Sequence, residues 1–194
     1  MPDLDPHRKL LILDRDGVIN QDSDVFVKSA DEWIPIPGSI DALARLSQAG
    51  WTLAIATNQS GLARGKFSSA DLTAMHDKMI HLVEQAGGHI DHIAFCPHGP
   101  DDHCDCRKPL PGLLEQIRTG LSLDDLEGAI MVGDALRDLQ AGQAMGCQAV
   151  LVRTGKGEKT LAAGEGLTQV AVVDDLASLA NLLLAPATPQ ALRA

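Results

Sequence analysis

The chain has 194 residues, of which 45% are hydrophobic and 22% are charged; this is typical of one globular domain with a substantial core and excludes a disordered chain. Its formal net charge of -10 excludes a general binder of nucleic acid or of anionic membranes, because such partners attract positive surfaces. No apolar run reaches the roughly 20 residues that cross a bilayer, and residues 1–5 are acidic where a signal peptide would be basic. We therefore expect a cytoplasmic protein.

The first predicted strand runs through the apolar residues 10–13 and leads directly into Asp14 and Asp16. A short apolar run that ends at a glycine turn is typical of a buried parallel strand, and open α/β sheets bind ligands at the carboxyl ends of their strands. Two carboxylates so close together repel each other unless a cation lies between them. The pattern therefore indicates a divalent metal, acid–base chemistry or both, and the alternative is an ordinary Asp-Gly turn.

Strands and helices alternate along the rest of the chain, as apolar periodicity, capping residues and glycine stops indicate. A long loop is predicted over residues 21–37, and Ser39 and Ser68 are the predicted N-caps of the first two helices. This alternation predicts an α/β fold, a doubly wound and mostly parallel sheet with helices on both faces. The further strands are predicted at 51–56, 90–96, 129–132, 149–152 and 170–173, and the helices between 39 and 50, at 68–85, 111–121, 136–145 and 176–184.

The strongest metal signal is a group of three thiols and one imidazole within residues 96–106, on an irregular segment. It fits a closed tetrahedral Zn²⁺ site, which would staple the loop rather than catalyse, since no position is left for water. Disulfides or free thiols are the alternatives, and disulfides are disfavoured without a secretion signal. His92 and His103 compete for the histidine role, whereas Cys147 is predicted to lie in the core. The predicted ligands are Cys96, His98, Cys104 and Cys106.

Groups suited to an anion follow several of these strands. Arg107 and Lys108 come directly after the cysteines and either clamp a phosphate or lie on the solvated surface. Thr57 and Asn58 offer neutral donors after the second strand. The negative net charge does not exclude a small anionic substrate, because a local positive pocket is enough. The candidate cations are Arg15, Arg64, Lys66, Arg107, Lys108 and Arg137.

A third strand-end acid, Asp134, follows the strand at 129–132. Together with Asp14 and a backbone carbonyl it would offer the oxygen ligands that Mg²⁺ prefers. Asp138 either caps and anchors the following helix, which is the preferred interpretation, or lies beside the metal ligands. Asp174 and Asp175 are predicted to cap the last helix.

Four motifs together resemble the haloacid dehalogenase (HAD) superfamily of phosphatases: D-R-D-G-V-I-N at 14–20, T-N-Q-S-G-L-A-R-G at 57–65, C-P-H with C-D-C-R-K-P, and G-D-x-x-x-D at 133–138. The resemblance covers about residues 9–155 in the family's order, and the cysteine loop joined to R-K-P is its most specific part. It implies a HAD-like Rossmannoid domain over residues 1–186, with a zinc-stapled loop at 96–106, no large cap domain and a flexible tail at 187–194.

The resemblance also implies a Mg²⁺-dependent phosphatase with structural Zn²⁺ that acts as a monomer on a small phosphorylated sugar, with no nucleic-acid or membrane partner. Hydrolysis of histidinol phosphate is the alternative activity. A zinc-stapled phosphate-binding module without turnover is the alternative from another class, and the intact pair of Asp14 and Asp16 disfavours it.

The resemblance assigns the catalytic roles residue by residue. Asp14 is the implied nucleophile, Asp16 the acid and base, and Thr57 and Lys108 hold the transferring phosphoryl group. Mg²⁺ is held by Asp14, a carbonyl of Asp16 and Asp134. The family pattern often has Lys after this Gly-Asp pair, where this chain has Ala135, and Arg137 is the candidate replacement. The residues implied to contact the substrate are Asp22, Ser23, Asp24, Val25, Asn58, Gln59, Ser60 and Arg107.

Overall fold

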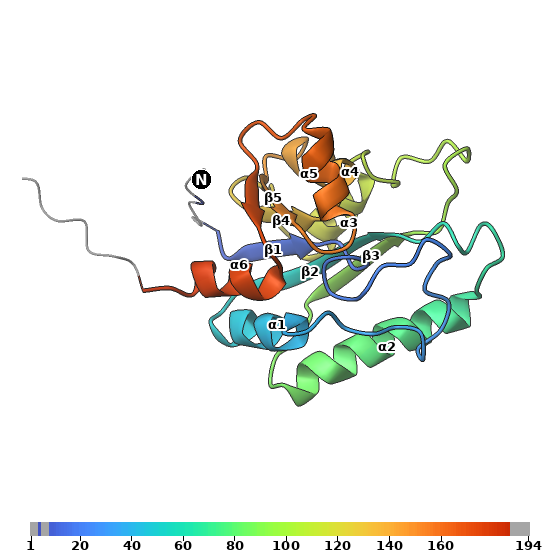
Figure 1. Cartoon of the computed structure of the whole chain (residues 1–194), viewed down its shortest axis with the longest axis horizontal. Coiled ribbons are helices and arrows are strands. Elements are labelled where there is room, and N and C mark those ends of the chain that lie inside the picture. Colours follow the sequence, from blue (N-terminus) through green and yellow to red (C-terminus); the bar gives the residue numbers. More distant parts are fainter. Residues whose placement is uncertain (1–3, 5–7, 187–194) are drawn as a thin grey trace, which may run out of the picture.

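The chain folds around one parallel sheet of six strands, as described by a computed structural model for residue 4 and residues 8–186 (Figure 1). The strand order is β3-β2-β1-β4-β5-β6, which confirms the predicted doubly wound sheet. The flexible tail predicted at 187–194 lies outside the described residues. The strands are β1 (Leu10–Leu13), β2 (Thr52–Asn58), β3 (His92–Cys96), β4 (Ile130–Gly133), β5 (Gln148–Val152) and β6 (Ala171–Val173).

Helices cover both faces of this sheet (Figure 1). Side chains alternate along β1, so that Leu11 and Leu13 join the core on one face while Leu10 and Ile12 join the core on the other. A central strand covered in this way meets no water, which explains why all four of its residues are apolar and buried. One face carries α1 (Ser39–Gln48), α2 (Ser69–Gln85) and α6 (Leu176–Leu183), and the other carries α3 (Gly112–Gly120), α4 (Leu136–Gln143) and α5 (Gly157–Ala163).

The helix starts confirm one predicted cap and correct another. Ser68 caps α2, because its hydroxyl accepts from the backbone N–H of Asp71, whose carboxylate accepts from the backbone of Ser68. Ser39 is not the N-cap of α1. Gly38 takes that position with a φ of 81°, and the Ser39 hydroxyl donates instead to the carbonyl of Ile19 at 2.7 Å. Ser39 therefore ties α1 to the loop after β1.

Two further differences from the predicted elements affect the functional edge of the sheet. β2 continues past the predicted end at residue 56, and Thr57 and Asn58 pair with Phe95 and Cys96 of β3. The short helix α5 was not predicted. Its first residue is Gly157 and it has no side-chain cap, so it lacks the usual signals of a helix start.

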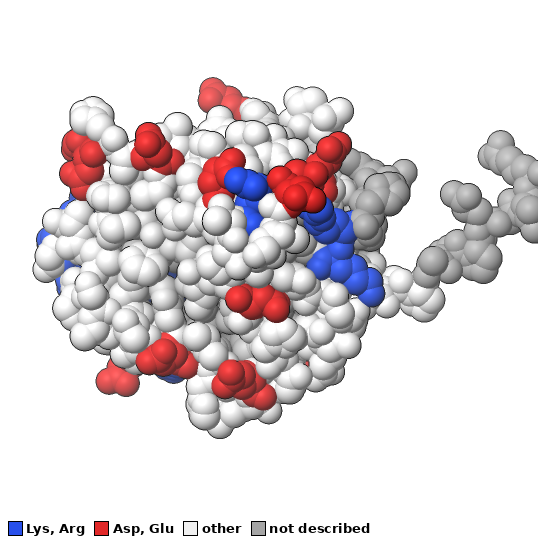
Figure 2. Space-filling view, turned by 180° about the vertical axis from the view of Figure 1, so that it is seen from behind, with Lys and Arg blue, Asp and Glu red and all other residues white. Residues whose placement is uncertain are grey.

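The described residues contain no separate cap domain, and the longest connections are the loops over residues 14–38 and 97–111. None of their helices combines the length and apolarity that crossing a membrane requires. On the face turned away from the viewer in Figure 1, acidic side chains are scattered and most of the visible basic ones lie next to acidic ones (Figure 2). That face therefore offers a phosphate no broad positive patch.

Candidate active site

Polar side chains from four strands meet at the carboxyl edge of the sheet. Asp14 follows β1, Asn58 ends β2, Lys108 lies in the loop after β3, and Asp134 follows β4. Parallel strands bring their carboxyl ends to the same edge, which is why residues far apart in the sequence gather here.

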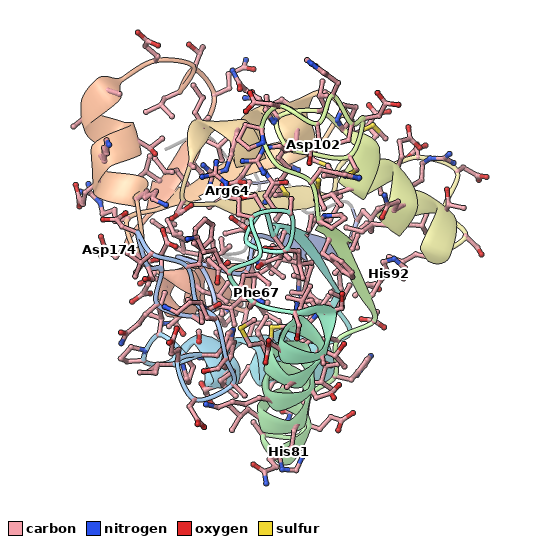
Figure 3. The ribbon with its side chains drawn as sticks, turned by 90° about the vertical axis from the view of Figure 1, so that its right-hand side faces the viewer. Arg64, Phe67, His81, His92, Asp102 and Asp174 are labelled. Atoms are coloured by element: carbon pink, nitrogen blue, oxygen red, sulfur yellow. The ribbon has the colours of Figure 1, made fainter. Side chains whose placement is uncertain are left out.

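The loops after β2 and β3 are tied to each other at this edge. The backbone N–H of Gln59 donates to the carbonyl of Cys96 at 2.7 Å, and that of Ala63 donates to the carbonyl of Pro97 at 3.3 Å. Figure 3 looks onto this side of the molecule, and the two loops, which carry Arg64 and Asp102, lie next to each other there. The two loops thus form one wall of the site.

Asp14 is buried at the end of β1. Its backbone N–H donates to the carbonyl of Val132, and its Oδ1 accepts from the backbone N–H of Arg15 at 2.8 Å. The ammonium of Lys108 lies 3.0 Å from the same oxygen. Burial raises the pKa of Asp14 to about 6, and the positive charge of Lys108 opposes this rise. The carboxylate is therefore fixed in place and its charge is only partly balanced.

Lys108 is fully buried between two acids. Its Nζ lies 2.7 Å from Oδ1 of Asp138, 3.0 Å from Asp14, and 2.6 Å from the carbonyl oxygen of Ala56. Burial alone would lower the pKa of Lys108, but the carboxylates of Asp138 and Asp14 outweigh it and raise this pKa. The backbone of Lys108 is fixed as well, because both amide atoms of Asn58 bond to its N–H and carbonyl at 3.1 Å.

Asn58 was predicted to contact the substrate; it lines the cavity over the acids, and its amide also bonds to the backbone of Lys108. Asp138 was predicted to cap and anchor α4, and its Oδ2 accepts from the backbone N–H of Ala135 at 3.1 Å. The pairing of Asp138 with Lys108 is a further role, which joins the start of α4 to the loop after β3.

The side chain of Asp16 is held by three donors. Arg15 contacts both carboxylate oxygens, with Nη2 at 2.9 and 3.0 Å, and Nδ2 of Asn20 lies 2.8 Å from Oδ1. Nε2 of Gln59 bonds to Oδ2 at 3.0 Å and to the Thr57 hydroxyl at 2.9 Å. Burial would raise the pKa of Asp16, but Arg15 and the two amides outweigh it and hold this pKa below its usual range. Asp16 is therefore ionised near neutral pH.

The carboxylates at the centre of the site fit a divalent cation. Oxygen atoms of Asp14, Asp134 and Asp138 lie within 4.8 Å of one another. Oδ1 of Asp134 is buried with no hydrogen-bond partner, and burial, with a further contribution from Asp14, raises the pKa of Asp134 to about 7. With Lys108 as the buried ammonium among them, these acids leave an excess of negative charge. Hard oxygen ligands with such an excess are what Mg²⁺ prefers.

The segment after β5 holds Asp134 in place, and its role was not predicted. The backbone N–H of Lys156 donates to Oδ2 of Asp134 at 2.8 Å, and the Thr160 hydroxyl donates to its carbonyl at 2.8 Å. A Cβ on Gly17 or Gly155 would overlap Oδ2 of Asp134, so the backbone at both positions approaches the acid closely. The polar run Arg-Thr-Gly-Lys, which directly follows β5, is the feature of the sequence that could have indicated this role.

A cavity of about 250 Å³ opens over Asp14 and Asp16, and its walls carry three cations, those of Arg107, Arg137 and Lys156. Arg137 thus supplies a positive charge to the cavity of a chain that has Ala135 where the family pattern often has Lys. Val25, one of the predicted substrate contacts, is 68% exposed and lies outside the lining. The other lining residues are Asp14, Asp16, Asp22, Ser23, Asp24, Phe26, Val27, Asn58, Gln59 and Ser60.

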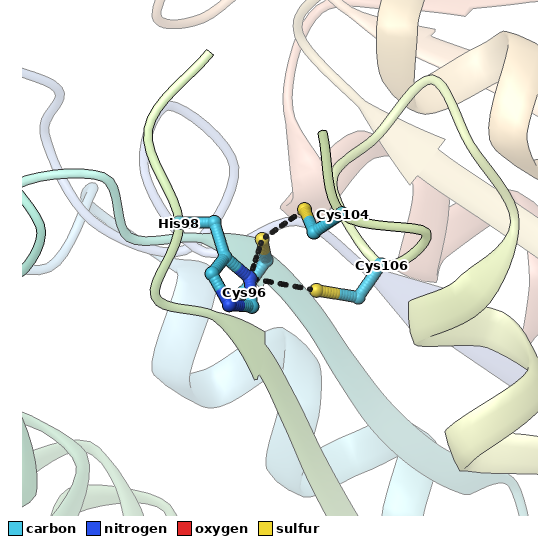
Figure 4. Close-up of side chains that lie close together, drawn as sticks. All are labelled: Cys96, His98, Cys104 and Cys106. Carbon is cyan, nitrogen blue, oxygen red and sulfur yellow. Dashed lines mark hydrogen bonds between the residues drawn. The ribbon is translucent and has the colours of Figure 1, made fainter. Parts of the chain in front are cut away.

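The loop after β3 brings the four predicted zinc ligands together (Figure 4). Sγ of Cys96 lies 3.7 Å from Sγ of Cys104 and 3.6 Å from Nδ1 of His98, which lies 3.3 Å from Sγ of Cys106. A tetrahedron with Zn–S bonds of about 2.3 Å has S–S edges of about 3.8 Å. Burial, followed by the neighbouring thiols, raises the pKa of Cys106 to about 12, so the cluster fits a cation that stabilises thiolates.

The competing ligands lie elsewhere. The ring of His92 lies against Gly120 of α3, and His103 lines a separate hollow beside Pro109. Cys147 is buried, and burial raises the pKa of its thiol to about 12, which confirms its place in the core.

The sheet and the arrangement of its strand-end acids and buried lysine are those of a HAD-type phosphatase, and the chain is a phosphoric monoester hydrolase. A family model described as "HAD-hyrolase-like" matches residues 105–179. Within this class, the chain belongs to the family of the D-glycero-beta-D-manno-heptose-1,7-bisphosphate 7-phosphatases.

Relatives of that name resemble nearly the whole chain. The enzyme of Pseudomonas putida is 56% identical over 91% of this chain and 99% of its own length, and that of Pseudomonas aeruginosa is 58% identical over 91% and 98%. The crystal structure of the D,D-heptose 1,7-bisphosphate phosphatase from B. bronchiseptica, complexed with magnesium and phosphate, has a TM-score of 0.88 at 58% identity, covering 91% of this chain and 98% of that one. These relatives disfavour both the histidinol phosphatase and the non-enzymatic alternative.

Proposed function

We propose that this chain removes the 7-phosphate of D-glycero-β-D-manno-heptose 1,7-bisphosphate through an aspartyl-phosphate intermediate. This activity would supply a precursor of the ADP-heptose used in the lipopolysaccharide core. The names of the relatives support the substrate. The observation that carries the chemistry is the contact of Lys108 with Asp14 at 3.0 Å, beneath a cavity that the Asp16 carboxylate also lines.

In the first step, a carboxylate oxygen of Asp14 attacks phosphorus in line, and the bond between phosphorus and the C7 oxygen breaks. The ammonium of Lys108 would balance the charge on the transferring phosphoryl oxygens, and the hydroxyl of Thr57 would donate a hydrogen bond to one of them. Asp16 gives its proton to the leaving alkoxide. In the free enzyme the low pKa of Asp16 favours its ionised form. The negative charge of the incoming phosphate raises this pKa, so that Asp16 takes up a proton from solvent before it donates to the alkoxide.

In the second step, the ionised Asp16 takes a proton from the water that attacks the phosphorus of the aspartyl phosphate. The bond between phosphorus and the Asp14 oxygen then breaks, which releases inorganic phosphate and restores the Asp14 carboxylate. Arg15, Asn20 and Gln59 orient Asp16 for both transfers.

Two metals fit this chain. Asp14, the carbonyl of Asp16 and Asp134 would hold Mg²⁺, which supplies positive charge to the phosphoryl oxygens when bound. Magnesium and phosphate in the solved relative support this assignment. Cys96, His98, Cys104 and Cys106 would hold Zn²⁺ as a structural ion that fixes the loop leading to Arg107 and Lys108.

The deciding experiment measures phosphate release from heptose 1,7-bisphosphate and from histidinol phosphate. We expect a clear preference in kcat/KM for the bisphosphate. Asp14→Asn should abolish release while its circular dichroism spectrum stays that of the wild type. Retained turnover would refute the nucleophile assignment, and a preference for histidinol phosphate would refute the substrate.

We infer a cytoplasmic monomer whose residues 1–186 form one domain, and size-exclusion chromatography with light scattering tests the oligomeric state.

A further inference from the structure

A second and larger hollow, with a volume of about 640 Å³, adjoins the active-site cavity. Asp22, Ser23, Asp24 and Lys156 line both spaces, so these residues form the boundary between them. The rest of the second hollow is lined by Gln21, Ile36, Pro37, Thr154, Gly155 and Lys159. A ligand that reacts at Asp14 and is longer than a single phosphate has room to extend into it.

Lys156 lies at this boundary, and its backbone and its side chain contact different residues. Its backbone N–H is fixed on Asp134, whereas its Nζ lies 2.7 Å from Oδ2 of Asp22 in the loop after β1. The Lys156 side chain is 41% exposed, and that of Asp22 19%. A partly exposed ion pair contributes only about 0 to 1 kcal/mol. A phosphate dianion, which has more negative charge and more acceptor oxygens than a carboxylate, can therefore replace Asp22 as the partner of Lys156.

The other two cations of the cavity have different surroundings. Arg107 donates from Nη1 to the carbonyl of His98 at 3.3 Å, on the wall formed by the zinc loop. Nε of Arg137 lies 3.9 Å from Oδ1 of Asp138, and Asp138 and Asp14 outweigh burial to raise the pKa of this guanidinium. Arg137 therefore offsets the charge of the central acids. The side-chain partner of Lys156 is instead Asp22, at the boundary between the two hollows.

We propose that Lys156 is a specificity-determining residue, which exchanges Asp22 for the second, non-reacting phosphate of the substrate. The second hollow then receives that end of the molecule. This inference rests on the proposed function, since it requires a substrate with two anionic groups. It assigns the selection of a bisphosphate over a monophosphate to a segment outside the four motifs.

The test compares heptose 1,7-bisphosphate with heptose 7-phosphate, which lacks the second phosphate. In Lys156→Gln the backbone N–H still reaches Asp134. We expect the ratio of kcat/KM for the two substrates to fall by about tenfold or more, mainly through the KM of the bisphosphate. Lys156→Arg should restore most of the ratio. Arg153→Gln is the matched control, since Arg153 pairs with Glu158 and lines neither hollow.

Each other outcome has a definite meaning. An equal loss on both substrates would show that Lys156 only supports the fold around Asp134, and an unchanged ratio in Lys156→Gln would show that the phosphate binds elsewhere; either result overturns the inference. A wild-type enzyme without preference for the bisphosphate would instead refute the proposed substrate. Asp22→Asn removes the competing carboxylate and should lower the KM of the bisphosphate, and a rise in this KM would contradict the exchange.

Discussion

Nζ of Lys108 lies 2.7 Å from Oδ1 of Asp138, and both side chains are fully buried. The pair joins the zinc loop to the first turn of α4, and the same ammonium contacts Asp14. The position of the zinc loop and the charge balance of the site thus both depend on the contact between Lys108 and Asp138. We therefore expect substitutions in this pair to affect stability strongly.

Asp138→Asn should lower the free energy of unfolding by about 2 kcal/mol, because the buried ammonium of Lys108 loses one of its two carboxylate partners and keeps only Asp14. Urea unfolding of the metal-loaded protein measures this change. Glu115→Gln removes a carboxylate from the partly exposed pair with Arg118 and should cost less than about 1 kcal/mol. Equal losses in the two variants would contradict the central role of the buried pair.

Gln59→Leu should shift the pH dependence of kcat. Without the Gln59 amide, the pKa of Asp16 rises, so the base form is lost at a higher pH and the acidic limb of the profile moves upward by about one unit or less. Gln48→Leu, on α1 and bonded to the carbonyls of Ala86 and Gly87, is the control. An acidic limb that stays in place would show that Asp16 does not set it.

His76→Gln should flatten the pH dependence of stability. Burial, with a smaller contribution from Arg15, lowers the pKa of His76 from 6.5 to about 4. The folded state favours the neutral imidazole of His76. The contribution of this residue to the free energy of unfolding is therefore complete above pH 6.5 and is lost as the pH falls toward 4. The loss reaches about 3 kcal/mol at most. Denaturant unfolding between pH 4 and 7 measures the slope, and the exposed His81→Gln on the same helix should keep it.

Purified protein should contain about one Zn²⁺ per chain, and Cys106→Ser should lose it. We expect loss of the ion to lower Tm and to abolish phosphate release, since the loop it fixes carries Lys108. Cys147→Ala, which removes a buried thiol outside the cluster, should keep the ion. Full activity of a zinc-free chain would refute the structural role.

The sequence predicted the sheet well because its strands are short apolar runs followed directly by polar residues. Leu10–Leu13 is buried on both faces, so local pattern and tertiary environment agree. The zinc cluster was predictable for a similar reason, since its four ligands lie within one short segment.

Features that depend on contacts between distant segments were not predictable in this way. Ser39 has the chemistry of an N-cap, but the nearby carbonyl of Ile19 takes its hydroxyl. The position of Asn58 after β2 predicted a substrate contact, but it gave no sign that the amide also bonds to the backbone of Lys108. Lys156 lies after β5 in a segment without apolar periodicity, and its importance becomes visible only through Asp22 and Asp134.

The hydroxyl of Thr154 bonds to the carbonyl of Gly17 across 137 positions of the sequence. Contacts of such long separation form late, and a domain emerging from the ribosome folds as a unit. The nucleophile is therefore synthesised early, whereas the segment that completes its surroundings arrives near the end. We expect nascent chains that stop before Thr154 to be inert toward phosphate esters, although they already contain all four motifs, including the whole zinc loop.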